Sequence, residues 1–140
     1  ARRDEEFTYY SLNTLRASME TYMNYLTHVL VITDACESGP SFYQAMRSEL
    51  KPRNCADWRA TQFKSSQIFS SAGYELAVDD SQFTRTFANA LKGNPNTCIS
   101  IEEIVLHVNR AVTQNNQQKP RFGKITGLKD EDGTFFFVKK

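Results

Sequence analysis

A cysteine follows directly after the most continuous apolar stretch of the sequence. Residues 28–33 read HVLVIT, and residues 34–39 read DACESG. The first run, rich in β-branched side chains, predicts a strand covered on both faces, as in parallel sheets flanked by helices. Open α/β sheets place their active sites just past the carboxyl ends of such strands. A thiol at a sharp turn there is exposed beside backbone N–H groups that can stabilise an oxyanion, so Cys36 is the candidate nucleophile.

The pattern around Cys36 also leaves a simpler interpretation open, because most free cysteines act as small buried hydrophobic residues. The other two cysteines, Cys55 and Cys98, are far from Cys36 and from each other in the sequence. An odd count without CxxC spacing predicts neither a disulfide framework nor a zinc site. We therefore expect Cys55 and Cys98 to be ordinary thiols.

The elements that must position Cys36 follow an α/β pattern without internal repeats. Helices are expected at residues 11–26, shortly after Pro40, at 83–91 and at 100–112, and strands at 28–33, 67–71 and 134–138. Apolar side chains recur at helical spacing in the long helical segments, Gly93 suits a C-cap, and Ser100 with Glu103 forms a capping box. The resulting order, α-β-α-β-α-α-β, is that of a layered α/β fold.

Two irregular segments are expected at the surface. Residues 49–60 lack periodicity, contain Pro52 and are rich in basic side chains, which predicts an exposed linker. Residues 130–133 (DEDG) predict a plain hairpin turn ahead of the last strand. They do not fit an EF-hand calcium loop, because that loop needs a ligand Glu where this chain has Lys139.

Composition argues against several classes of protein. With 140 residues the chain has the length of one domain, and a formal net charge of +1 argues against a nucleic-acid partner. No apolar run approaches the length of a membrane helix, and the first residues, ARRDEE, are too acidic for a signal peptide, which predicts a cytoplasmic protein. Neither a glycine-rich phosphate loop nor clustered metal ligands occur, so no metal or cofactor is expected.

The chain resembles the C-terminal part of caspase-like cysteine proteases of the bacterial metacaspase or orthocaspase type (peptidase family C14). HVLVITDACESG is similar to their nucleophile strand, in which an apolar strand runs into Asp-x-Cys-x-Ser-Gly. Residues 11–28 resemble the preceding helix, and residues 65–93 resemble the small-subunit strand, substrate loop and next helix. Residues 118–138 resemble the closing segment, so the resemblance spans about residues 8–138.

This resemblance implies that residues 1–140 are the C-terminal portion of a single caspase-like domain, an α/β/α sandwich of three layers. Residues 28–36 would carry the nucleophile strand, residues 49–60 the linker, and residues 65–140 a region like the small subunit.

The resemblance also implies a partner for the thiol that the sequence does not contain. The family's general base is the His of a His-Gly pair tens of residues before the cysteine, and this chain has no His-Gly pair. His28 precedes Cys36 by about 26 Å of extended strand, and His107 lies off the apolar stripe of its helix, which predicts a surface imidazole. We therefore expect a preceding segment or a second chain to supply the His-Gly pair, and this chain alone to be inert.

The resemblance further implies a pocket for a basic side chain. Asp34, two residues before Cys36, points to the same side of the strand, where metacaspases carry Asp and accept Arg or Lys at P1. The alternative is a carboxylate held by local backbone N–H groups. A second acidic group is expected at Glu75, or else at residues 79–80, and the backbone from Ser70 to Gly73 is expected to pair with a peptide as an added strand. The implied substrate-binding residues are Asp34, Ser70, Ser71, Gly73 and Glu75.

The expected function is a cysteine endopeptidase that cleaves proteins or peptides after Arg or Lys. An inactive caspase-fold interaction module is the alternative, and a flavodoxin-like nucleotide-binding domain would share the layer order but needs a glycine-rich loop after a strand. Self-cleavage is expected in the linker, because proteases cut flexible loops, with Arg53 as the preferred site. The candidate sites are Arg47, Lys51, Arg53 and Arg59.

Overall fold

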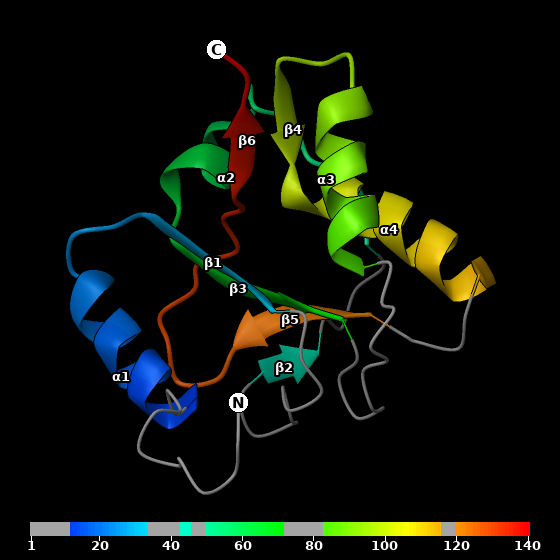
Figure 1. The fold of residues 1–140 in the computed structure, drawn as a ribbon. Helices are drawn as coiled ribbons and strands as arrows, with labels where there is room; N and C mark the ends of the chain where they lie inside the picture. The colour runs from blue at the N-terminus through cyan, green and yellow to red at the C-terminus, as the bar shows by residue number, and fades with distance from the viewer. Residues whose placement is uncertain (1–11, 34–42, 46–49, 72–82, 116–119) are drawn as a thin grey trace, which may run out of the picture.

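The computed structural model describes residues 12–33, 43–45, 50–71, 83–115 and 120–140. In chain order the elements are α1 (Leu12–Tyr22), β1 (His28–Thr33), β2 (Tyr43–Ala45), α2 (Trp58–Gln62), β3 (Ser65–Ser70), α3 (Phe83–Gly93), β4 (Cys98–Ser100), α4 (Ile101–Asn115), β5 (Arg121–Ile125) and β6 (Phe136–Val138) (Figure 1). The mixture of helices and strands confirms the α/β class.

Two separate sheets organise these elements. The larger one has four strands in the order β1-β3-β5-β2, and β4 pairs with β6 in a small antiparallel sheet. Strands β1 and β3 are parallel and in register from His28 opposite Ser65 to Thr33 opposite Ser70. Strand β5 runs antiparallel to both β3 and β2. The larger sheet is therefore mixed, and its one parallel pair consists of the two strands expected from the sequence.

Apolar side chains project from both faces of the larger sheet. On one face Ile68 of β3 packs with Met19 of α1, and Val29 and Val31 of β1 border this cluster. On the other face Phe69 packs against α3, α4 and β4. Figure 1 shows α1 on one side of the sheet and α3 with α4 on the other. Adjacent residues of a strand point to opposite faces, so the uninterrupted apolar run of β1 reflects two covered faces.

The amphipathic patterns of α3 and α4 predicted their packing correctly. Phe83 and Ala90 of α3 are buried in the larger core, together with Ile104 and Val105 of α4. The Ser100 Oγ accepts a hydrogen bond of 3.3 Å from the Glu103 N–H, as expected for the N-cap of α4. These helices end within a few residues of the positions that their periodicity indicates.

Strand β3 begins two residues earlier than its apolar pattern predicted. Its first three residues are polar, and all six residues of the strand are buried. Ser65 Oγ bonds to His28 Nδ1 at 2.7 Å, and Ser66 Oγ donates to the Lys129 carbonyl at 2.7 Å. Polar side chains with such partners are tolerated inside a protein, and an apolar pattern cannot reveal them.

Four short elements were missed. Strand β2 lies where a helix was expected after Pro40, although residues 40–42 themselves are outside the described residues. Helix α2 begins within the expected linker and extends beyond its predicted end at residue 60, and β4 and β5 were not anticipated. Three-residue strands such as β2 and β4 are too short to carry a periodic pattern, because their pairing depends on partners distant in the sequence.

The DEDG segment is not the predicted hairpin turn, because β5 and β6 belong to different sheets. It docks on the beginning of β3, where Asp130 Oδ2 accepts a 2.7 Å hydrogen bond from the Ser66 N–H and the Glu131 N–H donates to the Lys64 carbonyl. A Cβ atom on Gly133 would lie 1.8 Å from the Phe63 carbonyl oxygen, so this approach requires glycine. The segment thus links the two sheets.

The expectation that Cys55 and Cys98 are ordinary thiols is wrong, because they form a disulfide. The residues are 43 positions apart in sequence, and their Cα atoms are 6.5 Å apart. Folding brings the irregular segment before α2 next to β4, a proximity that cysteine spacing along the chain cannot indicate. Disulfides are rare in reducing cytosol, so a purely structural bond does not fit the predicted cytoplasmic location.

The expected linker is also more firmly held than predicted. Its Arg53 N–H donates to Ser100 Oγ at 3.1 Å, and the Arg53 guanidinium donates to the Asp132 carbonyl at 2.7 Å. With the disulfide two residues further on, residues 50–57 are fixed to the small sheet at several points. Arg53 is therefore a poor cleavage site in this structure.

None of the helices in the described segments has both the length and the apolar character needed to cross a membrane.

The disulfide yields a stability prediction. Cys55→Ser combined with Cys98→Ser should lower the free energy of unfolding by about 2 to 4 kcal/mol, because the bond restricts a long loop of the unfolded chain. Urea unfolding measures the difference, and wild-type protein in reductant should match the variant. A variant as stable as the oxidised wild type would contradict the bond's stabilising role.

Candidate functional site

The candidate site begins where β1 and β3 end side by side. Thr33 is opposite Ser70, and the Ser71 N–H donates to the Thr33 carbonyl at 2.9 Å. Both strands end here, at the carboxyl end of the parallel pair. The predicted residues Asp34, Cys36, Gly73, Glu75, Asp79 and Asp80 lie outside the described residues.

Ser70 and Ser71 are buried at this edge, with exposed fractions of 1% and 0%. Their hydroxyl oxygens have no hydrogen-bond partner among the described residues. Buried hydroxyl groups are usually paired, so two adjacent unpaired ones are unusual. They leave hydrogen-bonding capacity at the end of β3 for a polar group that the described segments do not provide.

The expected pairing of a substrate strand with the Ser70 backbone does not fit the sheet. Ser70 lies between Thr33 of β1 and Arg121 of β5, so neighbouring strands occupy both of its sides. The Ser71 N–H is likewise engaged with Thr33. Any added strand must therefore pair beyond Ser71, and the available contribution of these two serines is their side chains.

The outer edge of β1 borders the same site. Strand β1 is the first strand of its sheet, and within the described segments no strand pairs with its outer side. Five of its six residues are only partly buried, and Ile32 is 42% exposed. An unpaired apolar edge is a favourable surface for another strand. Among the described segments, the outer side of β1 therefore remains available to another strand.

Both histidines of the chain lie in described segments. His28 lies at the opposite end of β1, where its Nδ1 is 2.7 Å from Ser65 Oγ and its Nε2 is 2.6 Å from the Thr61 carbonyl. Because a carbonyl only accepts, Nε2 donates and Nδ1 accepts from the serine hydroxyl. His107 is exposed on α4, as predicted. His28 has a structural role at the beginning of β1.

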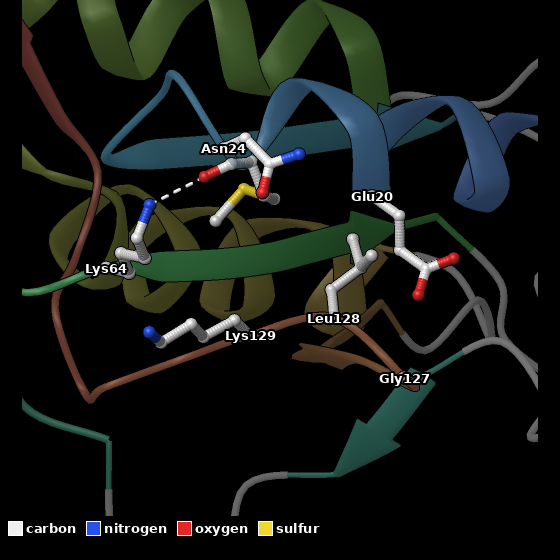
Figure 2. Close-up of a pocket in the computed structure, with 7 residues that line it drawn as sticks. Glu20, Asn24, Lys64, Gly127, Leu128 and Lys129 are labelled. Atoms are coloured by element: carbon white, nitrogen blue, oxygen red, sulfur yellow. Dashed lines mark hydrogen bonds between the residues drawn. The ribbon is translucent and has the colours of Figure 1, made fainter.

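A cavity of about 360 Å³ lies at the other end of the parallel pair, between α1 and the segment after β5 (Figure 2). Lys64 Nζ donates to the carbonyls of Met23 and Leu26, which satisfies groups at the end of α1. Lys64 precedes β3, so this cavity is about 20 Å along the strands from the edge at Ser70. The cavity is lined by Glu20, Met23, Asn24, Lys64, Gly127, Leu128 and Lys129.

A buried carboxyl group that the sequence analysis missed joins the two sheets. Glu102 is 3% exposed, and its Oε1 accepts a 2.6 Å hydrogen bond from the Thr134 hydroxyl. Gln67 of β3 donates to Thr134 Oγ1 at 3.1 Å and accepts from the Phe135 N–H at 3.0 Å. The only sequence signal for the burial of Glu102 was its position next to Ile101 at the start of α4. The capping-box pattern gives a role to the neighbouring Glu103 and none to Glu102.

Burial raises the pKa of the Glu102 carboxyl above its ordinary value, because desolvation penalises the charged form. The hydrogen bond from Thr134 and the positive charge of Arg53 act in the opposite direction. Glu102 reaches β3 only through Thr134 and Gln67, and Gln67 lies three residues, or about 10 Å along the strand, before Ser70. It is a feature of the core rather than a candidate catalytic acid.

Comparisons with known proteins give no information on the function of this chain. No protein-family model matches the chain, and neither curated proteins nor solved structures provide a match. Within the described segments, no group of three or more His, Cys, Asp or Glu side chains is arranged to hold a metal ion.

The buried carboxyl predicts a specific pH dependence. With a folded-state pKa above the unfolded value, Glu102 makes stability fall as pH rises from the unfolded pKa through the folded one. Glu102→Gln should therefore gain stability relative to wild type as the pH rises above 4.5, as measured by urea unfolding. Glu103→Gln controls for losing one carboxylate from the first turn of α4. A pH-independent difference between Glu102→Gln and wild type would contradict the raised pKa.

Proposed function

We propose that the chain is the nucleophile-bearing part of a caspase-like cysteine endopeptidase that cleaves after Arg or Lys. The observation that carries this proposal is the parallel pairing of β1 with β3, with Thr33 opposite Ser70. This pairing brings the two segments that resemble the protease motif to one edge of one sheet. The finer caspase-like topology of three layers is part of the proposal, and helices on both faces of the sheet support it.

Chain connectivity supports the grouping of the site residues. Consecutive Cα atoms are 3.8 Å apart, so Cys36 lies within about 11 Å of Thr33 and Gly73 within about 11 Å of Ser70. Thr33 and Ser70 are partners in adjacent strands. Connectivity therefore allows the thiol and the proposed substrate loop to lie side by side, as the proposed peptidase site requires.

The proposed chemistry is acyl transfer through a thioester. The Cys36 thiolate attacks the carbonyl carbon after the P1 residue, and backbone N–H groups at the strand-to-loop turn stabilise the oxyanion. Collapse of this intermediate breaks the peptide bond, and the departing amine takes a proton from the imidazolium of the His base. Water activated by the same His then hydrolyses the thioester and restores the thiol.

The His base must come from outside this chain, because His28 and His107 are otherwise placed. We propose that a segment carrying the His-Gly pair adds a strand to the outer edge of β1. The partly exposed apolar residues of β1, including Ile32, support this position. A parallel neighbour of β1 would also end at the edge where Thr33 ends.

Acidic side chains define the proposed substrate preference. Asp34 immediately follows the last residue of β1, and Glu75 lies four residues beyond Ser71. A carboxylate in a poorly hydrated pocket favours a guanidinium or ammonium group and disfavours an acidic one. The buried hydroxyl groups of Ser70 and Ser71 support a polar pocket at the same edge.

The nucleophile is tested by Cys36→Ala in the protein that contains the His-Gly segment. We expect loss of peptidase activity and of labelling by a cysteine-directed peptidyl-Arg probe, with urea unfolding unchanged. The matched control is Cys55→Ser with Cys98→Ser, assayed where that variant remains folded, which should keep both signals. Labelling that persists without Cys36 would refute the assignment, and a folded protein that neither cleaves nor reacts would favour the inactive interaction module.

The substrate preference is tested by Asp34→Asn. Losing a charge-assisted pair in a dry pocket should cost on the order of 2 to 5 kcal/mol of transition-state binding, measured as kcat/KM for substrates with Arg at P1. Asp57→Asn is the control, because Asp57 is an exposed N-cap of α2 and asparagine retains that function. Equal kcat/KM for wild type and Asp34→Asn, or preferred cleavage after Asp, would contradict the proposed pocket.

A further inference from the structure

The disulfide lies at an open cavity rather than inside the core. Cys55 and Cys98 are both partly exposed, and they line a cavity of about 490 Å³ together with Arg53 and Glu103. Disulfide exchange requires a thiolate to reach a sulfur atom, so access decides whether such a bond can react. The disulfide therefore borders a space that is large enough for a small thiol.

The disulfide also determines how firmly Arg53 is held. On one side of it, the Arg53 N–H and guanidinium bond to Ser100 Oγ and to the Asp132 carbonyl. On the other side, α2 begins at Trp58, and the Asp57 side chain caps it. Among the described residues between Leu50 and α2, the disulfide is the covalent tie to the small sheet. Without it, residues 50–57 would be held by the two hydrogen bonds of Arg53 and, at their ends, by the packing of Leu50 against the larger core and by α2.

We propose that Cys55–Cys98 is a thiol-exchange site whose reduction releases residues 50–57 for proteolysis after Arg53. Proteases act on segments that can leave the folded structure, and local opening depends on how many ties must break. The inference rests on the proposed function in one respect. If the physiological cleavage after Arg53 is self-cleavage, the protein needs the proposed pocket for Arg. Protection of Arg53 by the disulfide is a property of the fold.

The proposed reaction uses two equivalents of a small thiol as reductant. The first thiolate attacks one sulfur, forms a mixed disulfide and releases the other cysteine as a thiolate, which takes a proton. The second thiolate attacks the mixed disulfide, releases the remaining cysteine and leaves the reductant as its own disulfide. Two electrons thus pass from the two thiols to the Cys55–Cys98 bond. In a cytosolic protein, disulfides are usually redox-sensing, which agrees with this use.

The test is limited trypsin digestion of the full chain, because trypsin cuts after Arg without any contribution from Cys36. Oxidised and glutathione-reduced protein are digested, quenched, fully reduced and analysed by mass spectrometry. Reduction should accelerate cleavage after Arg53 at least ten-fold more than cleavage after Lys92 and Arg110, which lie within α3 and α4 and are cut only when those helices unfold. The Cys55→Ser and Cys98→Ser variant should be cut rapidly with or without glutathione.

Three outcomes would overturn the inference. Equal Arg53 cleavage in oxidised and reduced wild type would show that the disulfide does not protect the segment. Equal acceleration at Arg53, Lys92 and Arg110 would show that reduction unfolds the whole chain. A disulfide that resists glutathione while the protein stays folded, measured by alkylation of Cys55 and Cys98, would make the bond a structural staple. Because trypsin supplies the cleavage, none of these outcomes depends on whether the chain is a protease.

Discussion

The parallel pairing of β1 with β3 is the constraint on which the rest of the structure depends. Parallel strands need covering on both faces, and here α1 covers one face while α3 and α4 cover the other. The same pairing places Thr33 beside Ser70, so that β1 and β3 end together at the carboxyl end of the parallel pair. The core and the candidate site thus both depend on the register of β1 and β3. A slip of one residue would turn every side chain of β1 to the opposite face of the sheet.

The opposite end of this pair shows what keeps the register. Ser66 and Lys64 bond to the segment after β5, and Gln67 reaches Thr134 and through it the buried Glu102. These bonds satisfy buried polar groups at the beginning of β3 and tie the large sheet to the small one. The beginning of β3 is held by these hydrogen bonds, whereas the serine hydroxyl groups at its end have no hydrogen-bond partner among the described residues. That difference supports placing the proposed peptidase site at the end of β3 rather than at its beginning.

The irregular segment between β2 and α2 illustrates how a tertiary tie changes the meaning of a sequence. Basic residues and Pro52 indicate an exposed linker, and most side chains there are indeed exposed. The disulfide and the hydrogen bonds of Arg53 nevertheless fix it against β4. We therefore expect the access of a protease to this segment to depend on the redox state of Cys55 and Cys98 as well as on its composition.

The sequence by itself determined the elements whose information is local. The β-branched run of β1 and the periodic apolar residues of α3 and α4 predict their structures, because burial on defined faces repeats along the chain. Only the tertiary structure decided the Cys55–Cys98 bond, the short strands β2 and β4, and the burial of Glu102. Each of these depends on a partner far away in the sequence, and no local pattern records which distant residue will satisfy a thiol, a strand edge or a carboxylate.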